Sequence, residues 1–177
     1  MTKRGMFIGS LFVVYLFLLF KVILLKWNAI GLEALWYHFK TFLHHPYLIY
    51  ERQANLTLFD EISRDLNELS LSRFSGTTLF TNLVGNTLAF IPFGVFIAML
   101  SKLQRGLGIK IFVLSLLLSL FFEFSQFFLG IGIFDVDDLL LNTVGGMVGY
   151  IVWKVITIGV KVLQPATARG LKRTSHP

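Results

Sequence analysis

Four long apolar stretches constrain the fold of this chain more than any other feature of its sequence. They cover residues 6–25, 79–100, 110–130 and 138–159. Each approaches or exceeds the roughly 20 apolar residues that a helix needs to cross a bilayer. Only 15% of the 177 residues are charged and 55% are hydrophobic, whereas soluble domains carry about 25% charged residues. The sequence therefore predicts an all-α integral membrane protein with four transmembrane helices.

The basic residues predict the orientation of these helices. They precede the first stretch, separate the second from the third, and follow the fourth: Lys3, Arg4, Lys102, Arg105, Lys110, Lys161, Arg169, Lys172 and Arg173. Because Lys and Arg accumulate in cytoplasmic loops, we expect both termini inside the cell and the first and third loops outside. The net charge of +6 is then explained by anionic lipid, and we expect no nucleic-acid partner. The expected location is the cell membrane.

The chain is long enough for one membrane domain, which we place at residues 1–164, followed by a basic cytoplasmic tail at 165–177. The first outer loop, residues 31–78, is too long to be a simple linker. Four apolar residues in it recur at helical spacing: Leu58, Ile62, Leu66 and Leu69. An amphipathic helix on the outer leaflet would fit this spacing, and so would a small cap over the bundle. The segment "FLHHPY" in the same loop is interpreted as an interfacial turn.

Acids and amides occur in the predicted outer halves of three of the four helices. The candidate ligand-binding residues are Asn82, Asn86, Glu123, Gln126, Asp135, Asp138 and Asn142. Inserting an Asp at the centre of a membrane helix costs about 2.5 to 3.5 kcal/mol, so these side chains should face one another or water. The sequence thus predicts a polar pocket in the outer half of the bundle. Interhelical hydrogen bonding is the alternative, and it has most weight for Asn82 and Asn86.

Small residues and a proline accompany these polar groups. Asp138, Asn142, Gly145 and Gly149 are spaced 4, 3 and 4 residues apart and share one helix face. Gly145 and Gly149 form a G-x-x-x-G, which lets another helix approach closely. A second set, Pro92 and Gly94, predicts a kink in the second helix, which either shapes a cavity or is a simple kink without one.

The acids of "FDVDD" also fit a purely local role. Asp135 can cap the fourth helix, and Asp137 lies in its first turn, where a negative charge favours the helix dipole. A hard divalent cation bound by Asp135, Asp137 and Asp138 is a weaker alternative. Cysteine is absent from the chain, so a thiol nucleophile and a cysteine metal site are excluded. We expect no metal and no cofactor.

Three motifs carry a resemblance to a known family. "NLVGNTLAFIPFG", "EFSQFF" and "DVDDLLLNTVGGMVGY" resemble the VanZ family of bacterial membrane proteins. Its pattern falls here on Asn86, Phe90, Pro92, Gly94, Glu123, Gln126, Asp135, Asp138, Asn142, Gly145 and Gly149. The first-loop segment "RQANLTLFDEI" is also similar, although Thr57 and Leu58 depart from the family's I-P. The family often has an Arg three residues before the first Asp, where this chain has Gly132. The resemblance covers residues 52–149.

The resemblance implies a four-span fold and a role in the cell envelope, since the family is named for low-level resistance to teicoplanin-type glycopeptides. We expect a protein that binds a membrane lipid or a lipid-linked cell-wall component and so alters drug access. A second hypothesis is an intramembrane enzyme in which Glu123 and Asp138 act as general acid and base on a lipid-linked head group. A transporter or channel is the third, and the inner halves of the helices offer it little polar lining. The sequence leaves open whether the chain forms a homo-oligomer.

Overall fold

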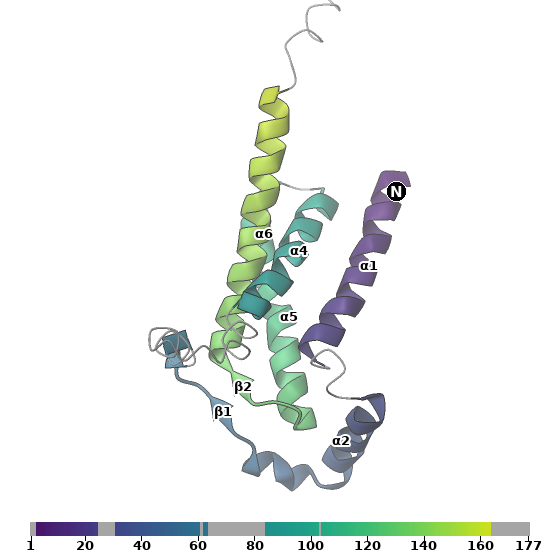
Figure 1. The fold of residues 1–177 in the computed structure, drawn as a ribbon, viewed down its shortest axis with the longest axis vertical. Coiled ribbons are helices and arrows are strands. Elements are labelled where there is room, and N and C mark those ends of the chain that lie inside the picture. The colour runs from purple at the N-terminus through teal and green to yellow at the C-terminus, as the bar shows by residue number, and fades with distance from the viewer. Residues whose placement is uncertain (1–2, 25–30, 61, 64–83, 103, 164–177) are drawn as a thin grey trace, which may run out of the picture.

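A computed structural model describes residues 3–24, 31–60, 62–63, 84–102 and 104–163. Four helices run along its long axis (Figure 1): α1 (Lys3–Ile23), α4 (Gly85–Leu100), α5 (Leu107–Leu129) and α6 (Val136–Leu163). Three of them, α1, α5 and α6, contain stretches long and apolar enough to cross a membrane, while α4 is apolar but shorter. The prediction of a helical membrane protein is confirmed, whereas the count of four spans and their orientation stay predictions. The predicted tail, Asn82, Leu66 and Leu69 lie outside the described residues.

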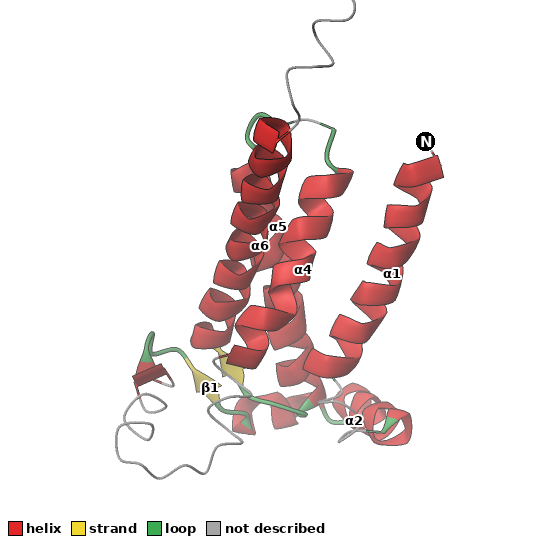
Figure 2. Cartoon of the chain, turned by 45° about the horizontal axis from the view of Figure 1, so that its top comes forward, coloured by secondary structure: helices red, strands yellow, loops and turns green. Residues whose placement is uncertain are grey.

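The first loop folds against one end of the bundle (Figures 1 and 2). It contains α2 (Leu32–His44), the 3-10 helix η2 (Pro46–Glu51) and the short strand β1 (Ala54–Asn55). Strand β1 pairs in parallel with β2 (Phe134–Asp135), and the partners are Ala54 with Phe134 and Asn55 with Asp135. The N-terminus of α1 and the end of α6 lie at the opposite end. The two-residue ladder therefore ties the first loop to the start of α6.

Helices α4 and α6 touch through their backbones. A Cβ atom added to Gly94, Gly145 or Gly149 would overlap with a carbonyl group of the facing helix. Glycine removes the side chain that would otherwise separate two helices, so the contact gains dispersion energy along the whole seam. Helix α4 is helical on both sides of Pro92. This seam sets how the polar residues of α6 face α4.

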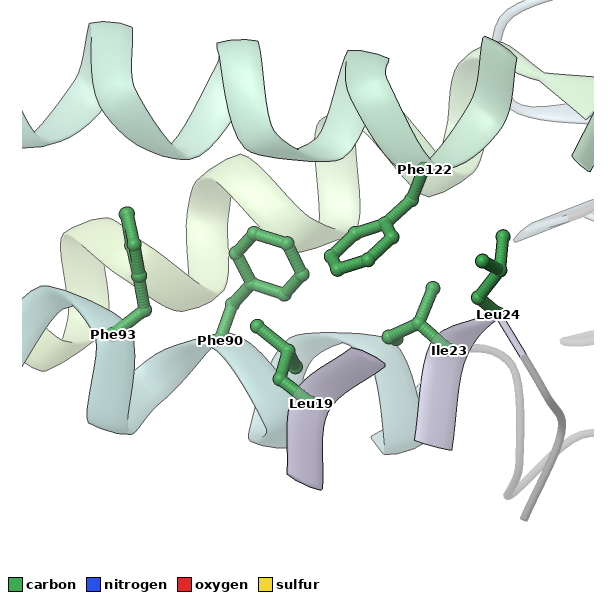
Figure 3. Packing of buried hydrophobic residues seen from close by; sticks show 6 residues of the cluster. All are labelled: Leu19, Ile23, Leu24, Phe90, Phe93 and Phe122. Carbon is green, nitrogen blue, oxygen red and sulfur yellow. The ribbon is translucent and has the colours of Figure 1, made fainter. Parts of the chain in front are cut away.

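Apolar side chains fill the rest of the bundle. One buried cluster joins the end of α1 to α4 and α5 through Leu19, Ile23, Leu24, Phe90, Phe93 and Phe122 (Figure 3). Many other large apolar side chains on the long helices are exposed, for example Phe7, Phe17, Leu117 and Ile156. Such an outward apolar surface suits a lipid environment and would be costly in water.

The described part of the first loop differs from the expectation. Helix α2 was not predicted, and "FLHHPY" contains the end of α2, the single residue His45 and the start of η2. Leu58 lies in a turn. Among the described residues of the first loop that follow β1, only Asp60 and residues 62–63 are helical. The expected amphipathic helix therefore does not include Leu58, and most of its remaining length lies outside the described residues.

Candidate functional site

Buried carboxylates at the first-loop end of the bundle form the candidate site. Glu123 of α5 is 1% exposed, and its Oε2 accepts the backbone N–H of Asp135 at 2.9 Å. Asp135 is 3% exposed. Its Oδ1 accepts the N–H of Asp137 at 2.7 Å, and its Oδ2 accepts the Nδ2–H of Asn55 at 2.9 Å. Two carboxylates thus connect α5, the start of α6 and β1, and the Asp135–Asp137 bond fits the cap predicted for α6.

Asp137 is fully buried and has a role beyond the one expected of it. Its Oδ1 accepts the N–H of Phe59 at 2.6 Å, and its Oδ2 accepts the N–H of Ile62 at 3.2 Å. Phe59 has φ 67°, a left-handed conformation that bulky residues rarely adopt. The carboxylate therefore holds a strained turn of the first loop against the bundle. It does so in addition to placing negative charge in the first turn of α6.

A second group of polar contacts joins α4, α5 and α6. Asn86 donates its Nδ2–H to Asp138 Oδ1 at 2.5 Å, and both side chains are partly buried. Asn142 donates its Nδ2–H to Ser119 Oγ at 2.8 Å. Among the described residues, Asn142 Oδ1 and Ser115 Oγ are buried without a hydrogen-bond partner. The polar face of α6 therefore continues along α5.

The serines of α5 were not predicted as part of the site. Ser115, Ser119 and Glu123 follow one another at intervals of four residues, and all three are buried. The same spacing relates Asp138 to Asn142 on α6. This i, i+4 register was the sequence pattern that could have identified the serines, because residues four apart share a helix face.

Gln126 lies at the junction with α1. Its Nε2–H is donated to the carbonyl of Ile23, the last residue of α1, at 3.0 Å. Nearby, Arg52 of the first loop donates to the carbonyl of Phe127, and its guanidinium lies against Gly130 at the end of α5. Basic side chains at a helix C-terminus satisfy its last carbonyls and complement its dipole.

Comparison with known proteins decides the family. The sequence profile of the VanZ/LLP1 family matches residues 12–157. The chain belongs to the VanZ/LLP1 family. It is 38% identical over 103 residues to Protein VanZ of Enterococcus faecium, a match that covers 58% of this chain and 61% of that protein. The match thus spans less than two thirds of the relative's length. No solved structure matches the chain. The predicted resemblance to VanZ is confirmed.

The VanZ-like motifs converge at one end of the bundle. Asn86, Glu123, Asp135, Asp138 and Asn142 come together there, as the contacts above show, while Gln126 fastens α1 to α5. The position where the family often has Arg is Gly132, and a Cβ there would lie 2.9 Å from Gln126 Oε1. Arg52 of the first loop lies against Gly130, two residues before this position.

The carboxylates of "FDVDD" are directed to hydrogen-bond donors. Asp135 and Asp137 accept backbone and amide N–H groups, and Asp138 accepts an amide. Within the described ranges, no group of three or more His, Asp or Glu side chains is placed to hold a metal ion. Chemically, the arrangement offers carboxylate and amide oxygens to donors, and its partly buried members are Asn55, Asn86 and Asp138.

Proposed function

We propose that this VanZ-like protein acts in the bacterial cell membrane and lowers susceptibility to teicoplanin-type glycopeptides by binding a lipid-linked cell-wall component at the carboxylate cluster. Membership of the VanZ/LLP1 family supports the role in the envelope. The observation that carries the proposal is the gathering of four acids at one end of an apolar bundle, three of them at most 3% exposed. Burying carboxylates beside lipid is costly unless they are paired or used, and intramembrane acids commonly mark functional sites.

The access point of this cluster is Asp138 with Asn86. Glu123, Asp135 and Asp137 are buried, whereas Asp138 and Asn86 are only partly buried. A ligand that reaches Asp138 meets oxygen acceptors, so it should bring hydrogen-bond donors such as hydroxyl, amide or ammonium groups. The sugar and peptide portions of a lipid-linked cell-wall component carry such donors. In the predicted orientation, with both termini inside the cell, this end of the bundle lies in the outer leaflet, where the ligand would be met.

Amide variants test the proposal. Glu123→Gln keeps an oxygen that can accept the N–H of Asp135, and Asp138→Asn keeps one that can face Asn86, while each removes a charge. We expect both variants to reach wild-type levels in the membrane and to lose the reduction in teicoplanin susceptibility in a sensitive host. Since both residues serve one site, the double variant should be no worse than either single one.

Asp60→Asn is the matched control, because Asp60 is an exposed acid at the same end of the molecule. It should retain the wild-type phenotype. The assay begins from a host in which the wild-type protein measurably changes susceptibility. Full activity in both amide variants would contradict the proposal and leave the acids with a structural role only.

An intramembrane enzyme is the second candidate. The partly buried Asp138, held 2.5 Å from the amide of Asn86, is a carboxylate in a position to exchange a proton with a ligand. The two functions separate in one measurement on purified protein with a lipid-linked cell-wall precursor. Binding alone leaves the precursor chemically unchanged, whereas an enzyme converts it to product that mass spectrometry detects, and Asp138→Asn would abolish that conversion.

A further inference from the structure

Helix α2 presents an apolar stripe that no described part of the chain covers. Leu32, Trp36, Phe39 and Leu43 follow one another at intervals of four, three and four residues, so they share one face of the helix. Their exposed fractions range from 39% to 72%. A stripe of this kind is unfavourable in water, because the cost of hydrating apolar surface grows with its area.

The stripe lies next to the side of α2 that packs on the bundle. Phe42 meets Phe128 of α5 edge to face, with ring centroids 5.6 Å apart. Leu35, on the same side, is partly buried. This contact fixes α2 to α5, and the stripe lies about a quarter turn round the helix from it. The orientation of the stripe is therefore a property of the fold.

The side of α2 opposite its contact with α5 is polar, and the stripe lies between these two sides. Glu33, Lys40, Thr41 and His44 lie on the polar side, and Lys40 reaches back over the ring of Trp36 with its Nζ 5.2 Å from the ring centroid. A helix with a polar side, an apolar stripe and a lysine at their border has the composition of a segment that lies in the plane of a membrane surface.

The residues around α2 also suit the surface of a membrane. Tyr47 and Tyr50 of η2 are 60% and 89% exposed, and they follow α2 directly. Trp and Tyr are enriched where acyl chains meet head groups. Both segments lie beyond the end of α1 in two views (Figures 1 and 2). Phe42, beside the stripe, contacts Phe128, and both Phe124 and Phe128 are exposed on α5, a helix long and apolar enough to cross a membrane.

We infer that α2 is an interfacial helix whose stripe inserts into the acyl chains just below the lipid head groups at this end of the bundle. The lipid that covers the exposed phenylalanines of α5 continues without interruption under α2. The polar face, with Lys40 and His44, remains at head-group level. The protein thus has a membrane-surface contact in addition to its spanning helices.

Spin-label accessibility tests this inference, and the absence of cysteine makes single-cysteine variants simple to label. The full chain would be labelled at one position at a time and reconstituted into phosphatidylcholine–phosphatidylglycerol vesicles. Labels at Leu32, Trp36, Phe39 and Leu43 should be accessible to oxygen and shielded from a water-soluble nickel chelate. Labels at Glu33, Lys40 and His44 should show the reverse. We expect the oxygen-to-nickel ratio to alternate several-fold between the two faces.

The native Trp36 gives a second measurement that leaves the stripe intact. In a Trp27→Phe, Trp153→Phe background, lipids brominated near the head group should quench Trp36 more strongly than lipids brominated near the chain end. Nickel accessibility on both faces, with no quenching by either lipid, would overturn the inference in favour of a helix off the membrane. Shielding of the stripe from both oxygen and nickel would also overturn it, since protein would then cover the face.

Discussion

At the scale of single residues, the acids at the first-loop end of the bundle accept hydrogen bonds from backbone N–H groups of the first loop and of the start of α6. Asp137 accepts the N–H groups of Phe59 and Ile62, and Glu123 accepts that of Asp135. A buried donor left unsatisfied costs about 1 to 3 kcal/mol. The carboxylates therefore shape the loop around the candidate site as well as supplying its charge.

Removing the Asp137 carboxylate should release the first loop from the bundle. Asp137→Ala leaves the N–H groups of Phe59 and Ile62 without this acceptor, so we expect a local loss of about 2 to 6 kcal/mol, twice the cost of one such group. Hydrogen exchange at residues 54–60 of the detergent-solubilised protein should accelerate, while exchange within α5 stays unchanged. Asp60→Ala, which alters an exposed acid nearby, should leave the exchange rates as they are. Equal rates in wild type and Asp137→Ala would show that the turn is held by other contacts.

The sequence identifies those site residues whose side chains are costly to place in lipid. Glu123 and Asp138 were identifiable because an ionisable group within an apolar stretch demands a reason. Ser115 and Ser119 were not, because serine is tolerated anywhere in an apolar helix. Arg52 reaches Phe127 across 75 residues of sequence, and no local pattern encodes a contact of that separation.

At the scale of helices, the contact of α4 with α6 depends on the absence of side chains. A Cβ atom at Gly149 would overlap with the carbonyl of Ile91, whereas a Cβ atom at Gly159, further along the same helix, would have nothing within 4 Å. Two glycines of one helix thus have opposite requirements. One tolerates a methyl group, and the other does not.

Alanine substitutions at these two glycines should have opposite effects on the stability of the protein. Gly159→Ala should leave stability unchanged or raise it by up to about 1 kcal/mol, since alanine is the better helix former. Gly149→Ala should destabilise, because α4 and α6 must move apart to admit the methyl group. The measurement is thermal unfolding in detergent, followed by circular dichroism. Equal midpoints for both variants would contradict the close contact.

The long helices were largely predictable, because an apolar segment long enough to cross a membrane must satisfy its own backbone hydrogen bonds, and a helix does so. Helix α2 escaped prediction for a physical reason. It has 13 residues, and its apolar and polar residues are so mixed that neither its length nor its average composition separates it from a loop. Only the helical spacing of Leu32, Trp36 and Leu43 identifies it.

At the scale of the whole molecule, the two ends of the bundle differ in character. One end contains the acids, α2 and η2, and the other contains the N-terminus of α1 and the turn before α5 (Figure 1). Lys102 and Arg105 lie in that turn. This separation agrees with the predicted orientation, in which basic segments stay in the cytoplasm.

Impermeant thiol reagents should distinguish the two ends in intact cells. Tyr50→Cys places a thiol on the exposed surface of η2, and Gln104→Cys places one in the exposed turn before α5. We expect labelling of the first variant and no labelling of the second until the cells are opened. The reverse pattern would put the carboxylate cluster on the cytoplasmic side and would remove the basis for binding an outer-leaflet ligand.

The pairing of β1 with β2 has a consequence for biosynthesis. Asn55 meets Asp135 across 80 residues, and Ile62 meets Asp137 across 75. During translation, the first loop is therefore complete long before its acceptors leave the ribosome, and its turn at Phe59 has no carboxylate to hold it. The loop closes only when the start of α6 arrives. A chain that stops within α5 would keep this segment open to proteases, so a cell could recognise and remove unfinished copies by the part that was made first.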